Sequence, residues 1–197
     1  CYMKEKYTPK FDCTRMFASW RETIKCEGKK PEFVLFTRIG RGTKRFLVNN
    51  VRWGNLMSDS ALECGDICER KNGDTLFLVA KTNSFNGDKG EFYTTNTTVN
   101  IYSVDNQPDE YGNTAGTTAT LKVKDLKCVY EDVSAKMHIF DYGLLPTTTK
   151  RFILPQDTKI ALLDRIEING QFLQIDVVNK FDFAPFLYVQ CSPDERG

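Results

Sequence analysis

The sequence predicts an all-β protein made of two related small β-barrel units behind an N-terminal arm with one short helix. Short alternating apolar runs, broken by Gly, Asn, Asp and Pro, recur along most of the 197-residue chain, which is typical of small barrels or sandwiches. In addition, the pattern Thr-Lys-Arg-Phe followed by two aliphatic residues stands at 43–48 and again at 149–154. The second observation indicates that the two units are copies of one design.

Each copy of this pattern is followed by an Asp, an Asn-Gly turn and an alternating apolar strand. Asn-Gly between such runs predicts a type I′ hairpin, because both central residues of that turn need a positive φ. The copies differ in spacing, which predicts an insertion at 49–60 in the first one. The repeat therefore pairs Phe46 with Phe152, Asp66 with Asp164 and Gly73 with Gly170.

The elements follow in chain order. A helix is predicted at 12–28, where Met16, Phe17, Trp20 and Ile24 share one helical face. We expect an arm at 1–30, a first β unit at 31–104, a polar linker or loop at 105–118 and a second β unit at 119–197. The strands expected within the units are 33–37, 45–48, 75–80, 99–104, 119–123, 127–131, 137–140, 151–154, 172–178 and 186–190.

Two polar stretches, 82–98 and 105–118, are long for tight turns inside compact β units. Loops of this kind often carry function, so both are candidates for contacts outside the barrels. The residues that we select in them, as candidates for intersubunit or channel loops, are Asn86, Asp88, Lys89, Asp109, Glu110 and Tyr111.

The composition limits the kinds of partner and compartment that the sequence indicates. Lys and Arg number 27 against 26 Asp and Glu, so no overall basic field indicates a nucleic-acid or anionic-membrane partner. No apolar run approaches the length of a membrane-spanning helix, and no membrane association is expected. The seven cysteines are scattered and odd in number, which favours free, mostly buried thiols in a reducing compartment.

A search for catalytic chemistry yields no catalytic, cofactor-binding or metal-binding residues, and no cofactor is expected. The single histidine, His138, lies in an alternating run and is interpreted as a sheet-face residue on a strand. Cys64 and Cys68 lack the second pair of ligands that a structural zinc site needs. The basic residues Arg38, Arg41, Lys44 and Arg45 surround a predicted turn and are candidates for contacts to DNA or an acidic partner.

The C-terminal half resembles the head-closure proteins, also called stopper or neck proteins, of long-tailed bacteriophages. The motifs that carry the resemblance are a strand ending in Glu131, an "rrf-x-LP" strand at 151–155 and a "gDri-x-x-nG-x-x-y-x-V" hairpin that begins near Asp164. The resemblance implies a structural ring protein in the virion neck, assembled in the host cytoplasm as a homo-oligomer. Its implied neighbours are the portal or adaptor protein on the head side, a tail protein on the other side, and packaged DNA.

Two other classes stay open at this point. One is a secreted or cell-surface β-sandwich binding module in which several cysteines pair and Asn96 carries a glycan. Thiol titration distinguishes it from the neck protein, which requires seven free thiols. The other is a hydrolase on a β scaffold, which the absence of a nucleophile-and-base motif disfavours.

Overall fold

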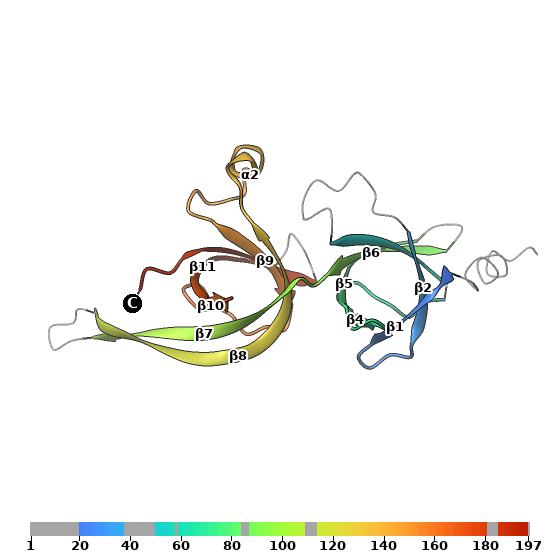
Figure 1. Cartoon of the computed structure of the whole chain (residues 1–197), viewed down its shortest axis with the longest axis horizontal. Coiled ribbons are helices and arrows are strands. Elements are labelled where there is room, and N and C mark those ends of the chain that lie inside the picture. Colours follow the sequence, from blue (N-terminus) through green and yellow to red (C-terminus); the bar gives the residue numbers. More distant parts are fainter. Residues whose placement is uncertain are drawn as a thin grey trace, which may run out of the picture. The chain divides into compact units, whose positions relative to one another are not determined.

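The computed structural model describes residues 20–37, 50–57, 59–83, 87–108, 114–180 and 185–196. The chain divides into two units, Cys1–Thr95 and Asn96–Gly197. Each unit is built around a closed barrel of six antiparallel strands (Figure 1). The prediction of an all-β chain with two related barrels is therefore confirmed. Within the described residues, no helix is long and apolar enough to span a membrane.

The first barrel joins its strands in the order β1-β2-β3-β6-β5-β4. Alternate side chains of these strands point inward and form a core that includes Ile24, Val34, Leu56, Leu78 and Phe92. The strand bounds are β1 (Glu22–Cys26), β2 (Glu32–Thr37), β3 (Val51–Leu56), β4 (Ile67–Arg70), β5 (Thr75–Thr82) and β6 (Asp88–Thr94).

The second barrel has a core of the same kind, which includes Ile101, Phe152, Leu154, Ile166 and Ile175. Its strands are β7 (Thr97–Pro108), β8 (Thr114–Asp132), β9 (Lys150–Pro155), β10 (Arg165–Ile168), β11 (Gln171–Asn179) and β12 (Phe186–Pro193). A short helix, α2 (Ala135–Phe140), lies in the connection between β8 and β9.

The two barrels share one topology. Read from β7, the second barrel has the order β7-β8-β9-β12-β11-β10, so each strand occupies the place of the strand six numbers earlier. Hydrogen bonds support the match: Leu78 N–H donates to Asp66 O at 3.0 Å, and Ile175 N–H donates to Asp164 O at 2.9 Å. Each Asp also accepts, at 2.8 Å, the N–H of the residue three positions before it. The expected correspondence of Asp66 with Asp164 is confirmed.

The expected correspondence of Phe46 with Phe152 is wrong. In both barrels a bulge follows the equivalent residues Leu78 and Ile175, which lie opposite Phe92 and Cys191 respectively. Following this register across to β3 and β9 places Gly54 at the position of Phe152. The predicted insertion at 49–60 therefore contains strand β3, whereas 45–48 lies outside the described residues.

At one pair of neighbouring core positions, the large and the small residue have changed places between the two barrels. The first barrel has a large Phe92 beside a small Gly54, whereas the equivalent positions of the second barrel hold a small Cys191 and a large Phe152. A Cβ on Gly54 would lie 2.5 Å from Val34 Cγ1 and 2.8 Å from Phe92 Cε2, so any larger residue would force these side chains to shift. Cores tolerate such exchanges when the total volume is kept.

The two β-hairpin turns are related but not identical. Asn169 and Gly170 have φ of 50° and 76°, so the two-residue turn expected between β10 and β11 is present. The turn between β4 and β5 also contains a glycine with positive φ, Gly73 at 90°, but Asn72 is not in the left-handed region. The first turn is therefore not type I′, because it is longer than the second.

Other sequence predictions are corrected by the fold. The helix expected at 12–28 is wrong over Glu22–Cys26, which forms β1, because Ile24 and Cys26 alternate into the barrel; residues 12–19 lie outside the described part. The strand expected at 137–140 is helix α2. The loop expected at 82–98 contains β6 and the start of β7.

The unit boundary also differs from the prediction. It falls between Thr95 and Asn96, and 105–118 is not a linker because its described residues belong to the β7–β8 hairpin of the second unit. A polar, Thr-rich sequence was read as a loop, but threonine is a good strand residue on exposed surfaces.

Candidate interaction surfaces

The most distinctive surface of the second unit is a two-stranded ribbon that extends from the barrel. Strand β10 pairs with β7 only over Asn100–Tyr102, and β9 pairs with β8 only over Val129–Asp132. Beyond Tyr102, strands β7 and β8 continue to pair with each other as far as Pro108 and Thr114. Figure 1 shows this ribbon projecting away from the strands of its own barrel. Here "ribbon" means 103–108 with 114–121.

The ribbon is an addition to the shared barrel design. In the first barrel the equivalent hairpin is short: β1 ends at Cys26, β2 begins at Glu32, and Lys29 N–H donates to Cys26 O within the turn. The equivalent of Cys26 in the second barrel is Ile101, after which β7 runs on to Pro108. Because the first barrel closes without such an extension, the ribbon is not needed for closing a barrel.

Several described residues of the ribbon are exposed, and its sequence contains no Lys or Arg. Asp105, Gly116 and Thr118–Thr120 are exposed, and Leu121 is 46% exposed at its base. The sequence 103–121 contains Asp105, Asp109 and Glu110 but no Lys or Arg. A surface of this charge repels phosphate groups, so it is suited to a protein partner and not to DNA.

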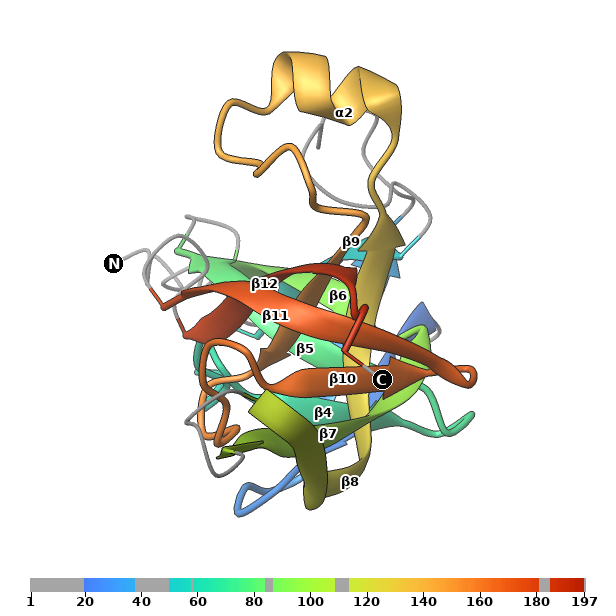
Figure 2. The same ribbon diagram turned by 90° about the vertical axis from the view of Figure 1, so that its left-hand side faces the viewer.

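A second projection, the connection 133–149, contains helix α2 and stands clear of the strands (Figure 2). Two buried polar side chains of the barrel wall hold its base. Gln190 Oε1 accepts the N–H of Leu145 at 3.0 Å and the hydroxyl of Thr148 at 2.9 Å, and Gln190 Nε2 donates to Gly143 O at 2.8 Å. This side chain therefore uses three of its hydrogen-bonding positions to fix the returning chain.

Arg151 is the other anchor. Its guanidinium lies 2.6 Å from Glu131 and 3.0 Å from Asp141, and the residue is only 4% exposed. Burial alone would lower the pKa of Arg151, but hydrogen bonds with Tyr188 and Glu131 raise it above its usual range. For Tyr188 the effect of burial has the opposite sign, and it raises the pKa of the phenol. The arginine stays charged and ties Asp141, directly after α2, to β8 and β9.

On this rigid base the connection presents apolar side chains to solvent. Tyr142 is 97% exposed, Ile139 66% and Leu145 39%. We call these three residues the knob. Single exposed apolar residues are ordinary, but three within seven positions on one anchored projection indicate a contact surface.

The same unit has a hollow of about 420 Å³ that is open to solvent. Val123 and Leu126, which pack against the barrel core, form its apolar part. The remaining lining residues are Lys122, Asp157, Thr158 and Lys159. Lys122 is neutralised by Asp164 at 2.8 Å, whereas Thr158 Oγ1 is buried without a hydrogen-bond partner among the described residues. We call this site the hollow.

Beside the hollow, a loop is held in a strained conformation. Leu163 has φ of 68°, where the first barrel has Gly65 with φ of 101°. Arg196 donates to Leu163 O at 3.0 Å and also binds Asp194, which accepts from Arg165 too. Burial acts to raise the pKa of Asp194, but the hydrogen bonds from Arg196 and Arg165 outweigh it and the pKa is lowered.

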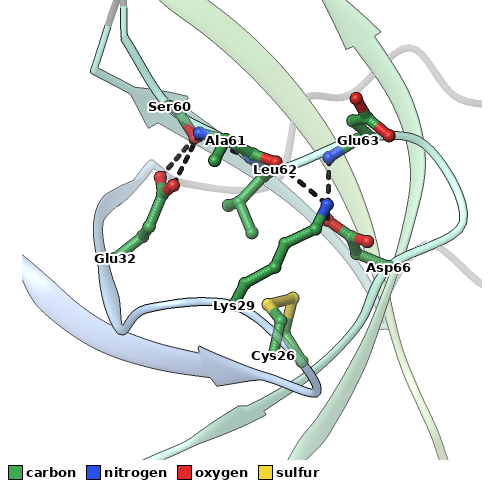
Figure 3. Close-up of a disulfide and its surroundings, with 9 residues drawn as sticks. Cys26, Lys29, Glu32, Ser60, Ala61, Leu62, Glu63 and Asp66 are labelled. Carbon is green, nitrogen blue, oxygen red and sulfur yellow. Dashed lines mark hydrogen bonds and ion pairs between the residues drawn. A yellow bond between two sulfur atoms is a disulfide. The ribbon is translucent and has the colours of Figure 1, made fainter.

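The first barrel carries a disulfide between Cys26 and Cys68 (Figure 3). These residues lie opposite each other where β1 and β4 close the barrel; the second barrel has Ile101 opposite Ile166 at this place. Lys29 Nζ lies 2.6 Å from Asp66 nearby and donates to Ala61 O. The expectation of seven free thiols is therefore wrong, because barrel closure brings together cysteines that are 42 residues apart.

The remaining described cysteines are free: Cys64 is exposed, and Cys128 and Cys191 are buried in the second barrel. Burial raises the pKa of Cys128 to about 12 and that of Cys191 well above its usual value. Neither buried thiol is a nucleophile at neutral pH. No group of three or more His, Cys, Asp or Glu within the described ranges could hold a metal ion.

The residues selected from the sequence are only partly described. Arg38, Arg41, Lys44, Arg45, Asn86, Asp109, Glu110 and Tyr111 lie outside the described residues. Asp88 is in β6 and forms an ion pair with Lys81 at 3.2 Å, while Lys89 is exposed on the same strand. His138 lies on α2 next to the knob residue Ile139, so its interpretation as a sheet-face residue on a strand is wrong.

Sequence reasoning missed the knob, the hollow and the disulfide. The knob had a local signal, since Tyr142-Gly143-Leu144-Leu145-Pro146 places apolar residues in a turn-rich segment. The hollow and the disulfide had none, because their residues come from segments that are distant in the sequence.

No protein-family model and no curated protein matches the chain. Among solved structures, it is similar to the solution structure of protein SF1141 from Shigella flexneri 2a, with 18% identity and a TM-score of 0.39. The match covers 52% of this chain and 96% of that one. A likeness at this level does not identify a function.

Proposed function

We propose that this chain is a non-enzymatic, ring-forming structural protein of a phage neck, and that the ribbon is its assembly arm. The ribbon carries the proposal. An isolated two-stranded β-ribbon is marginally stable at best in water, so a projecting one needs a neighbour that supplies further pairing or packing. Its sequence is rich in strand-forming threonine and poor in apolar side chains, which favours main-chain pairing over a hydrophobic contact.

The neck assignment draws on the head-closure resemblance. Its "rrf-x-LP" motif falls on β9 and its Asp-to-Asn-Gly motif on the β10–β11 hairpin. A closed barrel with a projecting hairpin is a suitable building block for a heterologous ring, since one subunit can reach its neighbour without exchanging core strands. In this proposal the ring sits between the portal or adaptor protein and a tail protein, and it retains packaged DNA.

In this proposal, acidic and basic segments of the chain bind different partners. Because the stretch 103–121, which includes the ribbon, has three acidic and no basic residues, the ribbon binds protein in this proposal. Contact with DNA is assigned to Arg38, Arg41, Lys44 and Arg45, the basic residues that follow β2 in the sequence. Removing two of these charges should weaken retention of DNA without changing the subunit mass of the ring.

The chain itself provides a matched control for the ribbon. Replacing 103–121 by the turn of the first barrel, Glu27-Gly28-Lys29-Lys30-Pro31, should leave a second barrel that folds and melts cooperatively but no longer assembles. Analytical ultracentrifugation of the full chain and this variant, with negative-stain imaging, measures the result. Full-length protein that stays monomeric at all concentrations, alone and in particles, would overturn the proposal.

A second candidate, a secreted or cell-surface binding module, is favoured by one observation, the Cys26–Cys68 disulfide, which counts against the neck protein because that class was expected to have seven free thiols. Disulfides persist mainly in oxidising compartments and are rare in cytosolic proteins. Trapping thiols with an alkylating reagent at cell lysis, followed by peptide mass spectrometry, distinguishes the candidates. A linked Cys26–Cys68 peptide from extracellular material supports the module, and alkylation of both residues in assembled particles supports the neck protein.

A further inference from the structure

We propose that the knob of one subunit binds in the hollow of a second copy, so that second barrels join head to tail. This inference deepens the proposed ring and rests on it for the identity of the partner. It concerns the second unit alone, since both surfaces belong to that barrel.

The topology places the two surfaces at opposite ends of the barrel. The knob connection leaves β8 at Asp132 and enters β9 at Lys150, whereas the hollow residues Asp157, Thr158 and Lys159 follow the other end of β9 at Pro155. Six strand residues at about 3.3 Å each separate these ends by roughly 20 Å. A knob cannot reach the hollow of its own barrel, but it can reach that of the next copy.

Shape and polarity fit the same pairing. The hollow of about 420 Å³ has space for an aromatic side chain, and Val123 and Leu126 provide the apolar surface on which the Tyr142 ring can pack. Asp157 and Lys159 line the hollow and are exposed, so they offer hydrogen-bond partners to the phenol hydroxyl of Tyr142. Burying the ring thus need not leave its oxygen unsatisfied.

An ion pair between Lys136 and Asp157 would fix how the two barrels are oriented in this pairing. Lys136 is exposed on α2 one helical turn before Ile139 and has no ion-pair partner among the described residues. Asp157 lines the hollow, is exposed and likewise has no ion-pair partner in the described part of the chain. Lys159 also lines the hollow and repels Lys136, so it favours the docked position in which Lys136 faces Asp157. A docked knob would bring this cation to this anion, which fixes the orientation of one barrel against the next.

The contact is too small to hold two free subunits together. A tyrosine buries about 150–250 Å², and the three knob side chains together stay well below the total area of about 1,200–2,000 Å² of a stable pairwise interface. A head-to-tail contact of this size becomes effective when closure of a ring, or the ribbon, raises the local concentration. This explains why the same surfaces stay exposed in a single subunit.

Crosslinking tests the pairing directly. In a background with Cys1→Ser, Cys13→Ser and Cys64→Ser, Gly143→Cys combined with Lys159→Cys should give a ladder of covalent multimers on mild oxidation, because both positions are exposed and Tyr142 and Asp157 are kept. A disulfide needs Cα atoms within about 7 Å, so the two ends of one barrel cannot crosslink within a chain. The single variants serve as controls and should give at most dimers.

Charge reversal and mixing complete the test. Lys136→Asp and Asp157→Lys should each reduce multimer formation at least tenfold in sedimentation velocity, and the double variant should restore it. A knob variant that carries both Ile139→Ser and Tyr142→Ser can be mixed with the hollow variant Asp157→Lys. Because only one pairing is then possible, assembly should stop at dimers. The control Ile67→Ala, at an exposed position of the first unit, should assemble normally. Assembly that depends on the ribbon but shows no ladder and no charge rescue would overturn this inference and leave the ring. Absence of any assembly would overturn both.

Discussion

Reducing the Cys26–Cys68 disulfide should destabilise the first unit and leave the second unchanged. The bond joins residues that are 42 positions apart and ties β1 to β4, which share only three residue pairs. The loop-entropy relation gives about 4 kcal/mol for a separation of this size. For a unit of this length, at about 4–8 °C per kcal/mol, the melting temperature should fall by on the order of 20 °C.

The chain allows each unit to be followed separately. Both of its tryptophans, Trp20 and Trp53, belong to the first unit, so tryptophan fluorescence reports on that unit alone, while circular dichroism reports on both. Melting curves with and without reductant should show a shifted fluorescence transition and an unshifted second transition. Equal fluorescence midpoints under both conditions would refute the reasoning.

A matched variant separates the crosslink from the packing. Cys26→Ile with Cys68→Ile installs the pair that the second barrel has at Ile101 and Ile166. This variant keeps apolar side chains at the seam but lacks the crosslink, so its stability should not respond to reductant. If it matched the oxidised parent, the loss on reduction would arise from packing and not from the constraint on the unfolded chain.

Three further predictions concern single residues. Gly54→Ala should destabilise the first unit by about 1–3 kcal/mol, because its Cβ meets the ring of Phe92 at 2.8 Å; unchanged urea unfolding would contradict the close packing. Leu163→Gly should leave the second unit at least as stable as the parent, since a left-handed leucine costs about 1–2 kcal/mol, whereas the control Leu162→Gly should lose stability. The pKa of Asp194 is lowered in the folded protein, so its carboxylate stabilises the second unit above the unfolded pKa of about 3.9. This contribution is lost as the pH falls from that value through the lower pKa of the folded state. Asp194→Asn should therefore flatten the acid limb of the stability curve, and an identical limb would exclude this role.

The sequence was sufficient for local features of the fold. Alternation along 75–80, 151–154 and 172–178 predicted β5, β9 and β11, and Asn169-Gly170 predicted the turn between β10 and β11. These features depend on neighbours in the sequence, which a single chain displays. Strand β3 was missed because Val51–Leu56 contains Arg52, Gly54 and Asn55, and its glycine is explained only by Phe92 on another strand.

Features that depend on closure could not be predicted. The position of the disulfide, the place of Arg151 beneath α2 and the hollow all arise where strands distant in the sequence meet. The short run at 137–140 alternates well enough for a strand, but no neighbouring strand pairs with it, and Ser134 begins a helix instead. The repeat at 43–48 and 149–154 was correct about duplication and wrong about the register, since β9 corresponds to β3.

Because the barrel is duplicated, the connections 133–149 and 38–50 occupy equivalent places in the two units. The connection 133–149, which carries α2 and the knob, joins β8 to β9, and the equivalent connection of the first barrel joins β2 to β3. That connection is 38–50, and it contains all four basic residues selected from the sequence: Arg38, Arg41, Lys44 and Arg45. Equivalent connections leave their barrels at the same end, so one design has been given an apolar contact surface in one copy and a basic segment in the other. In the function proposed above, the two copies have different partners, protein for the second unit and packaged DNA for the first, although their strand order is the same.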